Sequence, residues 1–191
     1  MNLFEPKKRY PLETGCMLIS EPFMNDDSFQ RAVILIAAYK PEKGAFGLVL
    51  NHPSPFAIND AVPEVYDFNT LYEGGPVSEN ELFYIHTVGH LLTNCENIID
   101  DVCFGGDFEN VKSLINSGVI KPHHIMFFKG YSGWDAGQLE QEIENGAWVV
   151  SPYNASLLFA DADTDIWSKA LNDLGDIYPL WTEFPINPNE N

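Results

Sequence analysis

Residues 129–148 read KGYSGWDAGQLEQEIENGAW, and this stretch sets the expected organisation of the chain. The apolar run IMFF at residues 125–128 leads into it and predicts a short buried strand. Gly130 and Gly133 then predict a turn, because glycine accommodates the positive φ angles that turns often need. Functional residues concentrate on loops held between regular elements, so we expect any site to lie near this turn.

A capped helix is predicted directly after the turn. Asp135 precedes a helical pattern and Gln138 follows three residues later, the spacing at which two side chains each satisfy a backbone N–H. Apolar residues recur every four positions from Leu139 to Ala147 and mark the buried face. We therefore expect Asp135 to cap a helix that begins near Ala136, with Gln138 reaching back. The positions expected to face solvent are Glu140, Gln141, Glu142 and Glu144.

The composition is that of a single folded domain. At 191 residues the chain is long enough to bury a core, and apolar residues make up 45% of it. No apolar run is long enough for a membrane helix, and the N-terminal segment lacks the apolar stretch of a signal peptide. Cys16, Cys95 and Cys103 lack metal-binding or CxxC spacing, which is typical of reduced, buried thiols. We expect a soluble cytoplasmic protein without a membrane partner.

The chain is strongly acidic. Ten lysines and arginines against 28 aspartates and glutamates give a formal net charge of −18, and no basic stripe is present. Affinity for nucleic acid comes mainly from lysines and arginines that neutralise phosphates, so we expect no direct nucleic-acid binding. The charge is compatible with a basic protein partner and with simple solubility.

The remaining pattern predicts an α+β fold. Apolar runs at residues 32–39 and 45–51, joined by KPEKG, predict a central hairpin. Further strands are predicted at residues 16–19, 82–88, 98–104 and 148–150, and helices at residues 108–117, 152–158 and 164–174. Because the hairpin comes first and the helices cluster in the second half, we predict one domain with a strongly bent, mixed or antiparallel sheet. We expect residues 1–13 to form an N-terminal arm, residues 14–184 the domain and residues 185–191 a disordered tail.

Four segments of the sequence carry a family resemblance. They are GCMLISEPFMNDDSF at residues 15–29, GAFGLVLNHP at 44–53, GGPVSENELFYIH at 74–86 and GYSGWDAGQLEQEIENGAW at 130–148. In this order they resemble the YqgE/AlgH family of bacterial proteins, over residues 14–175. The resemblance implies a small α+β domain whose sheet bends into a pseudo-barrel with flanking helices. It implies no assigned biochemical activity and no established catalytic residues, although one branch of the family carries a label as a regulator of alginate synthesis.

Ser132 is the first candidate for chemistry, because it lies between two glycines just ahead of a helix. A serine nucleophile needs a base within hydrogen-bond reach and a group that orients the base. His86 is the candidate base and Glu140 the candidate orienting group. The sequence GYSGW resembles the G-x-S-x-G elbow of hydrolases only in part, because its second glycine comes one residue early. An enzyme of unknown class that uses residues 130–140 and His86 is therefore the alternative hypothesis.

A binding site is the second candidate. Glycine-rich backbone and a helix N-terminus offer N–H donors to a ligand, with Tyr131 and Trp134 as aromatic walls. The same glycines are also compatible with tight packing around a buried Trp134, and Asn51 either presents its amide to a ligand or ties off a turn. The candidate ligand-binding or partner-binding residues are Asn51, Gly74, Gly75, His86, Gly130, Tyr131, Ser132, Gly133, Trp134, Gln138 and Glu140.

No metal or cofactor is expected. His123 and His124 are adjacent and would point to opposite faces of a strand, and no HExxH or paired-cysteine motif is present. The double glycine at Gly74 is not followed by the lysine and serine or threonine of a phosphate-binding loop. The main hypothesis is a non-enzymatic regulatory or binding protein with an unknown protein or small-molecule partner. An open pocket that unites Ser132, His86 and Glu140 would favour the enzyme instead.

Overall fold

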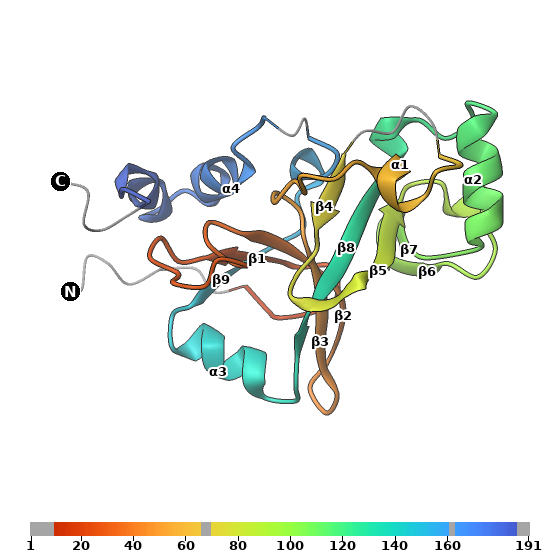
Figure 1. The fold of residues 1–191 in the computed structure, drawn as a ribbon. Coiled ribbons are helices and arrows are strands. Elements are labelled where there is room, and N and C mark those ends of the chain that lie inside the picture. Colours follow the sequence, from red (N-terminus) through yellow and green to blue (C-terminus); the bar gives the residue numbers. More distant parts are fainter. Residues whose placement is uncertain (1–9, 66–69, 161–162, 187–191) are drawn as a thin grey trace.

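The computed structural model describes residues 10–65, 70–160 and 163–186. Within these ranges nine strands form one mixed sheet in the order β6–β7–β5–β8–β3–β2–β1–β9, and β4 lies beside β8 (Figure 1). The strands are β1 (Met17–Ser20), β2 (Val33–Lys40), β3 (Gly44–Val49), β4 (Leu71–Glu73), β5 (Val77–His86), β6 (Glu96–Ile99), β7 (Val102–Phe104), β8 (Ile125–Trp134) and β9 (Trp148–Ser151). The α-helices are α1 (Ile58–Ala61), α2 (Phe108–Asn116), α3 (Gln138–Glu144) and α4 (Ile166–Leu174). Short 3₁₀ helices occupy Gly89–Leu91, Pro122–His124, Ala155–Leu157 and Tyr178–Glu183.

Strand β8 is shared by the two halves of the sheet. Its first part pairs with β5 in antiparallel and with β4 in parallel orientation, and its last three residues pair with β3. The predicted turn at Gly130–Gly133 is therefore wrong, because the backbone continues as a strand through Trp134. The cross-strand partners Gly47 and Ser132 show why: hydrogen bonding to β3, distant in sequence, extends the strand past the glycines.

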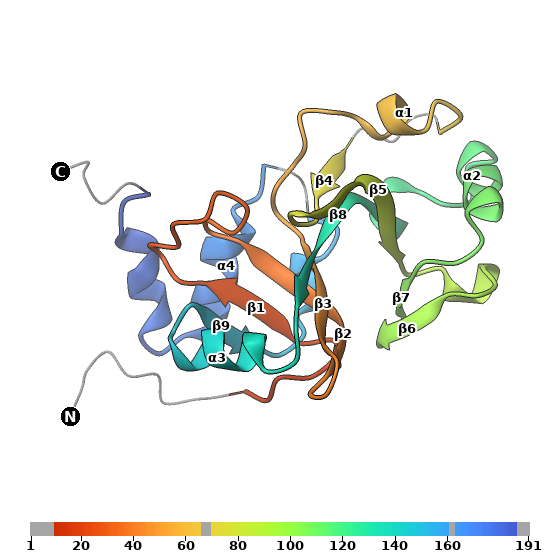
Figure 2. The same ribbon diagram turned by 60° about the horizontal axis from the view of Figure 1, so that its bottom comes forward.

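The half of the sheet formed by β9, β1, β2 and β3 is covered on both faces. Figures 1 and 2 show α4 on one face and α3 on the other. The apolar run of β1 reflects this burial, since Met17 and Ile19 pack in the core below α4 whereas Leu18 packs in the core beside α3. The predicted central hairpin is confirmed as β2 and β3, which pair in antiparallel register.

The other half of the sheet packs against α1 and α2. Helix α2 has the predicted N-cap, Asp107, whose side chain accepts a hydrogen bond from the backbone N–H of Asn110. Val111 and Ile115 bury their side chains against Phe127 of β8. The predicted strand at residues 98–104 is instead the hairpin β6–β7, which turns at Asp100 with φ 50°. The predicted helix at residues 152–158 is reduced to one 3₁₀ turn after Pro152.

The predicted α+β class, with a bent, mixed sheet and flanking helices, is confirmed. Residues 1–9 of the predicted arm and 187–191 of the predicted tail lie outside the described residues. Tyr10 and Leu12, which lie near the end of the predicted arm, pack against the core beside α3. Among the described residues, no helix has the length and apolar character needed to cross a membrane.

Candidate functional site

A large bulge in β5 shapes the surface at the junction of the two half-sheets. Val77 pairs with Tyr131 and Leu82 pairs with Lys129, so residues 78–81 all lie opposite the single residue Gly130. Ser78 at the start of the bulge has φ 51°, and the bulged side chains are exposed. A bulge of this kind turns a strand segment out of the sheet and re-aims its side chains.

Close packing of three glycines makes the bulge possible. A methyl group at Gly130 would lie 2.4 Å from the carbonyl oxygen of Gly75, and one at Gly74 would lie 2.3 Å from the carbonyl oxygen of Gly130. Gly130 also has φ +66°, which favours glycine. These glycines therefore let two backbone segments approach each other, which is the packing alternative that the sequence left open.

The bulge forms one wall of a cavity of about 260 Å³ between β5 and α1. It is lined by Phe56, Asp60, Ala61, Leu71, Glu79, Asn80, Glu81, Leu82 and Lys129. A smaller hollow of about 70 Å³ shares Glu79 and Lys129 and is otherwise lined by Ser28, His52, Glu73, Gly75 and Pro76. We refer to the residues lining these two hollows together as the bulge cleft.

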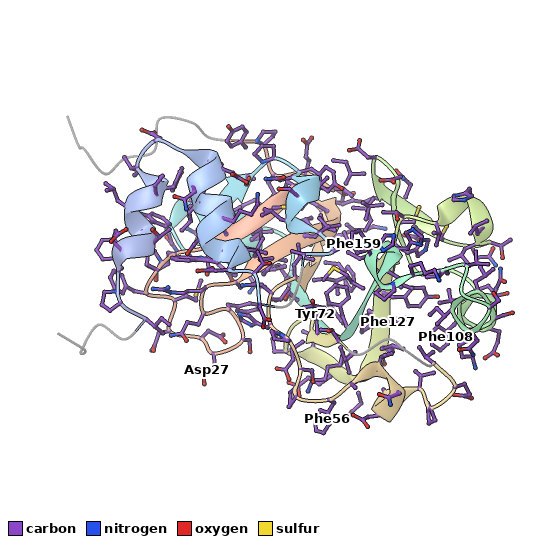
Figure 3. All side chains as sticks on the ribbon, turned by 90° about the horizontal axis from the view of Figure 1, so that it is seen from above. Asp27, Phe56, Tyr72, Phe108, Phe127 and Phe159 are labelled. Carbon is purple, nitrogen blue, oxygen red and sulfur yellow. The ribbon has the colours of Figure 1, made fainter. Side chains whose placement is uncertain are left out.

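The bulge cleft combines an apolar floor with an acidic rim. Leu71 is buried at its base, and Phe56 is 56% exposed beside it; Figure 3 shows the Phe56 side chain at the outer edge of the molecule, next to α1. Lys129 Nζ lies 3.3 Å from Glu73 Oε1 and 5.9 Å from the centroid of the Phe56 ring. The carboxylates in the lining are those of Asp60, Glu73, Glu79 and Glu81. They outnumber the single lysine, so the cleft favours a cationic ligand group.

Two histidines, His52 and His86, each donate a hydrogen bond to a backbone carbonyl oxygen. His52, in the smaller hollow, places Nε2 3.0 Å from the carbonyl oxygen of Gln30, and burial lowers its pKa. His86 is fully buried, with Nε2 2.8 Å from the carbonyl oxygen of Gly105 and Nδ1 3.3 Å from the N–H of Val88. Because a carbonyl oxygen only accepts, Nε2 carries the proton in both rings. The two ring nitrogens of His86 are thus already engaged within the protein.

The predicted catalytic group does not assemble. His86 pairs with Ile125 at the start of β8, whereas Ser132 lies seven residues further along the same strand, which corresponds to roughly 23 Å of chain at the rise of a regular β-strand. Ser132 is fully buried and donates a hydrogen bond to the carbonyl oxygen of Gly74, at 3.0 Å. Glu140 accepts a hydrogen bond from the Tyr39 hydroxyl at 2.6 Å. None of these three residues lines the bulge cleft.

The remaining predicted site residues have structural contacts. Asn51 ties two strands together, since its amide donates to the carbonyl oxygen of Arg31 and accepts from the N–H of Val33, both at 2.8 Å. Tyr131 packs its ring on that of Phe46, with centroids 4.7 Å apart. Gly133, in the same strand, leaves room for the Tyr131 ring, which a methyl group there would meet at 3.0 Å.

The predicted capping box at α3 is half correct. The Gln138 amide oxygen accepts from the N–H of Asp135 at 3.0 Å, as expected. The expectation that Asp135 caps the helix is wrong, because α3 begins at Gln138 and Gly137 occupies the N-cap with φ 79°. The expected solvent role of Glu142 is also wrong, since it accepts hydrogen bonds from the indole N–H groups of Trp134 and Trp148 at 2.9 and 2.8 Å.

The sequence and the fold of this chain resemble those of known proteins. The family model described as AlgH-like matches residues 17–179, which is most of the chain. The chain belongs to the AlgH-like family. The family resemblance predicted from the four sequence segments is thereby confirmed.

Similar AlgH-like proteins occur in several bacteria. The chain is 36% identical to a UPF0301 protein of Cytophaga hutchinsonii over 182 residues, which cover 94% of this chain and 100% of that protein. It is 34% identical to a UPF0301 protein of Chlorobium luteolum over the full length of both. Among solved structures, a protein of Corynebacterium diphtheriae matches with a TM-score of 0.76 and 28% identity, over 93% of this chain and 95% of that one. The solution structure of AlgH from Pseudomonas aeruginosa matches with a TM-score of 0.71 and 27% identity, over 94% and 98%.

Sequence reasoning missed most of the bulge cleft in this AlgH-like chain. Of the predicted residues only Gly75 lines it, whereas Phe56, Glu79 and Lys129 were not singled out. One signal was present: the polar run SENE at residues 78–81 stands between Gly-Gly-Pro-Val and the apolar strand pattern that starts at Leu82. A polar insertion of that kind indicates a bulge when it is followed by a regular strand.

The buried His86 predicts a pH dependence of stability. Burial lowers its pKa in the folded protein below the ordinary 6.5, despite the hydrogen bond to Gly105. The unfolded chain therefore takes up a proton first, so the free energy of unfolding falls as the pH drops below about 6.5 and levels off below the folded pKa. Chemical denaturation at several pH values from 7.5 to about 5 should show a shallower fall for His86→Gln than for the parent. The exposed His90→Gln is the control, and an equal slope in all three proteins would contradict the assignment.

Proposed function

We propose that this protein is a non-enzymatic binding protein, with a regulatory role, whose bulge cleft holds a basic segment of a partner protein. The observation that carries the proposal is the rim of four carboxylates around an apolar floor with an exposed Phe56. An arginine or lysine side chain satisfies such a site, because its stem packs on apolar surface while its charged end pairs with carboxylates. The aromatic ring adds a face on which a guanidinium stacks.

The size of the cleft supports a side chain of a partner over a free cofactor. The larger hollow, of about 260 Å³, is smaller than the range of roughly 300–1,000 Å³ that is usual for drug-sized ligands. The net charge of −18 supports a cationic partner in the same way, since it attracts such a partner over long range at low salt. The same charge opposes binding to nucleic acid, so we propose a protein partner and no nucleic-acid partner. A cytoplasmic location is part of the proposal and accords with three free thiols.

A pair of synthetic peptides tests the proposed site. One fluorescently labelled peptide alternates arginine and leucine, and its counterpart alternates glutamate and leucine. We expect anisotropy titrations of the full chain to show binding of the arginine peptide, which weakens as NaCl rises from about 50 to about 500 mM. The double variant Glu79→Gln/Glu81→Gln should bind the arginine peptide about three- to tenfold more weakly, the loss expected for two surface ion pairs. Phe56→Ala should weaken it to a similar degree.

A matched control separates the cleft from the acidic surface in general. Glu96→Gln/Glu144→Gln removes the same charge from exposed positions outside the cleft and should leave the affinity within about twofold of the parent. If both double variants weaken binding equally, the attraction is non-specific and the proposed site is wrong. Binding of the glutamate peptide with the same affinity as the arginine peptide would equally refute it.

A further inference from the structure

Two of the three cysteines meet at the β6–β7 hairpin, which the bulge cleft does not use. Cys95 lies directly before β6, and Cys103 lies in β7 opposite Asn97. Both sulfur atoms face the same backbone position: a methyl group placed on Gly89 would be 2.7 Å from Cys103 Sγ and 3.7 Å from Cys95 Sγ. Cys95 is also close enough to Cys103 to raise the pKa of the Cys103 thiol.

Glycines and weak contacts with backbone carbonyl oxygens surround these two thiols. Glycines stand on two sides of the pair, since a methyl group on Gly106 would lie 3.5 Å from Cys95 Cβ. The contacts of the sulfur atoms with backbone carbonyl oxygens are long and weak: Cys95 Sγ lies 3.9 Å from the carbonyl oxygens of Gly89 and Leu92, and Cys103 Sγ lies 3.8 Å from that of Asp101. Cys95 precedes the first paired residue of the hairpin, so ladder hydrogen bonds do not hold it at a distance from Cys103.

The two cysteines differ in exposure, and this difference indicates which thiol reacts first with an oxidant. Cys95 is half-buried, whereas Cys103 is only 8% exposed. Burial raises the pKa of Cys103, and the neighbouring Cys95 raises it further, so the Cys103 thiolate forms less readily. Cys95 is therefore the thiol that meets an oxidant first, and Cys103 the one that resolves the product.

We propose that Cys95 and Cys103 form a reversible disulfide when the protein meets hydrogen peroxide. The Cys95 thiol gives up its proton and the thiolate attacks one peroxide oxygen. The O–O bond breaks, Cys95 becomes a sulfenic acid, and the departing hydroxide takes up the proton from Cys95 and leaves as water. The Cys103 sulfur then attacks the Cys95 sulfur, the S–O bond breaks, and the hydroxyl group leaves with the Cys103 proton as a second water. The two thiols are thus oxidised by two electrons and the peroxide is reduced. A small dithiol returns both cysteines to the reduced state by exchange.

Cys16 provides an internal control for this pair. It is 4% exposed in the core beside α3, and burial raises its pKa to about 11. Thiolate is the reactive form, so Cys16 should stay reduced under conditions that oxidise the other two.

Thiol counting on the full chain tests the proposal. The native protein is treated with hydrogen peroxide, denatured, and alkylated with N-ethylmaleimide before mass spectrometry. We expect three alkylated cysteines before oxidation, one after it, and three again after treatment with dithiothreitol. Peptide mapping should place the remaining label on Cys16 and a crosslink between Cys95 and Cys103. Cys16→Ala should form the same crosslink, and Cys103→Ser should form none within the chain.

Other outcomes would overturn the proposal. These are three alkylated cysteines after oxidation, a crosslink that contains Cys16 or joins two chains, and overoxidised Cys95 beside a free Cys103. The map of the unsubstituted protein decides the question even where a serine variant does not fold. Failure here leaves the peptide titrations of the bulge cleft untouched, because the two sites share no lining residue.

Discussion

Gly130→Ala is expected to lower the free energy of unfolding by about 2–5 kcal/mol, the largest loss we predict for a single methyl group in this protein. Two effects add. The φ of +66° disfavours any residue with a Cβ atom, by roughly 1–2 kcal/mol. The new Cβ would also lie 2.4 Å from the carbonyl oxygen of Gly75, a backbone atom that moves only if the Gly74–Gly75 segment moves. The bulge beside this contact should therefore change shape as well.

Gly105→Ala separates the two effects. Gly105 has nearly the same φ, +68°, but a methyl group there meets nothing within 4 Å. It should therefore lose only the conformational part, about 1–2 kcal/mol. Urea midpoints of the two variants and the parent give the comparison, and amide hydrogen exchange across residues 74–82 reports on the bulge. Equal losses in both variants would show that the close approach of Gly130 to Gly75 is unimportant.

Glu142→Ala is expected to lower the free energy of unfolding by about 2–4 kcal/mol, although Glu142 lies on a short surface helix. One carboxylate oxygen accepts from the indole N–H groups of both Trp134 and Trp148, whose side chains are 6% and 3% exposed. Removing the carboxylate leaves two donors in a mostly apolar core beside α3, and each unmet buried donor costs about 1–3 kcal/mol. The other carboxylate oxygen accepts from Gln138, so the start of α3 loosens too.

Two further variants serve as comparisons for Glu142→Ala. Glu142→Gln keeps a carbonyl oxygen that reaches the indoles and should lose less stability than Glu142→Ala. Glu144→Ala, at an exposed position of the same helix, should stay within about 0.5 kcal/mol of the parent. Denaturant midpoints followed by tryptophan fluorescence measure both the stability and the environment of the indoles. A Glu142→Ala protein as stable as Glu144→Ala would mean that water replaces the carboxylate without loss.

The order of strands and helices could be predicted because it depends on local patterns. The apolar runs on either side of KPEKG are long, rich in β-branched residues and separated by a turn, and they form β2 and β3. Asp107 ahead of an amphipathic segment likewise identified α2, because an N-cap acts within one helical turn. The acidic charge is also a property of composition alone.

The candidate site could not be predicted in the same way. Glycines at 130 and 133 are compatible with a turn and with a strand. This segment is a strand because it pairs with β3 and β5, which lie elsewhere in the sequence. The position of Phe56 beside Lys129 depends on how α1 lies over β5, which no pattern within either segment expresses. The spacing of Glu142 on its helix predicts a solvent-facing position. Glu142 instead accepts hydrogen bonds from two tryptophans, because two different strands bring their indole rings beside it.

By itself, the sequence determined the family, the α+β class, the hairpin, the capped α2 and the strong negative charge, since each rests on neighbouring residues or on composition. Only the tertiary structure decided that β8 runs unbroken past Gly130, that four bulged residues oppose one glycine, and that Cys95 meets Cys103. The physical reason is common to all three. Register and close approach are set by hydrogen bonding and packing between segments far apart in the chain, where a single atom of extra volume decides what fits.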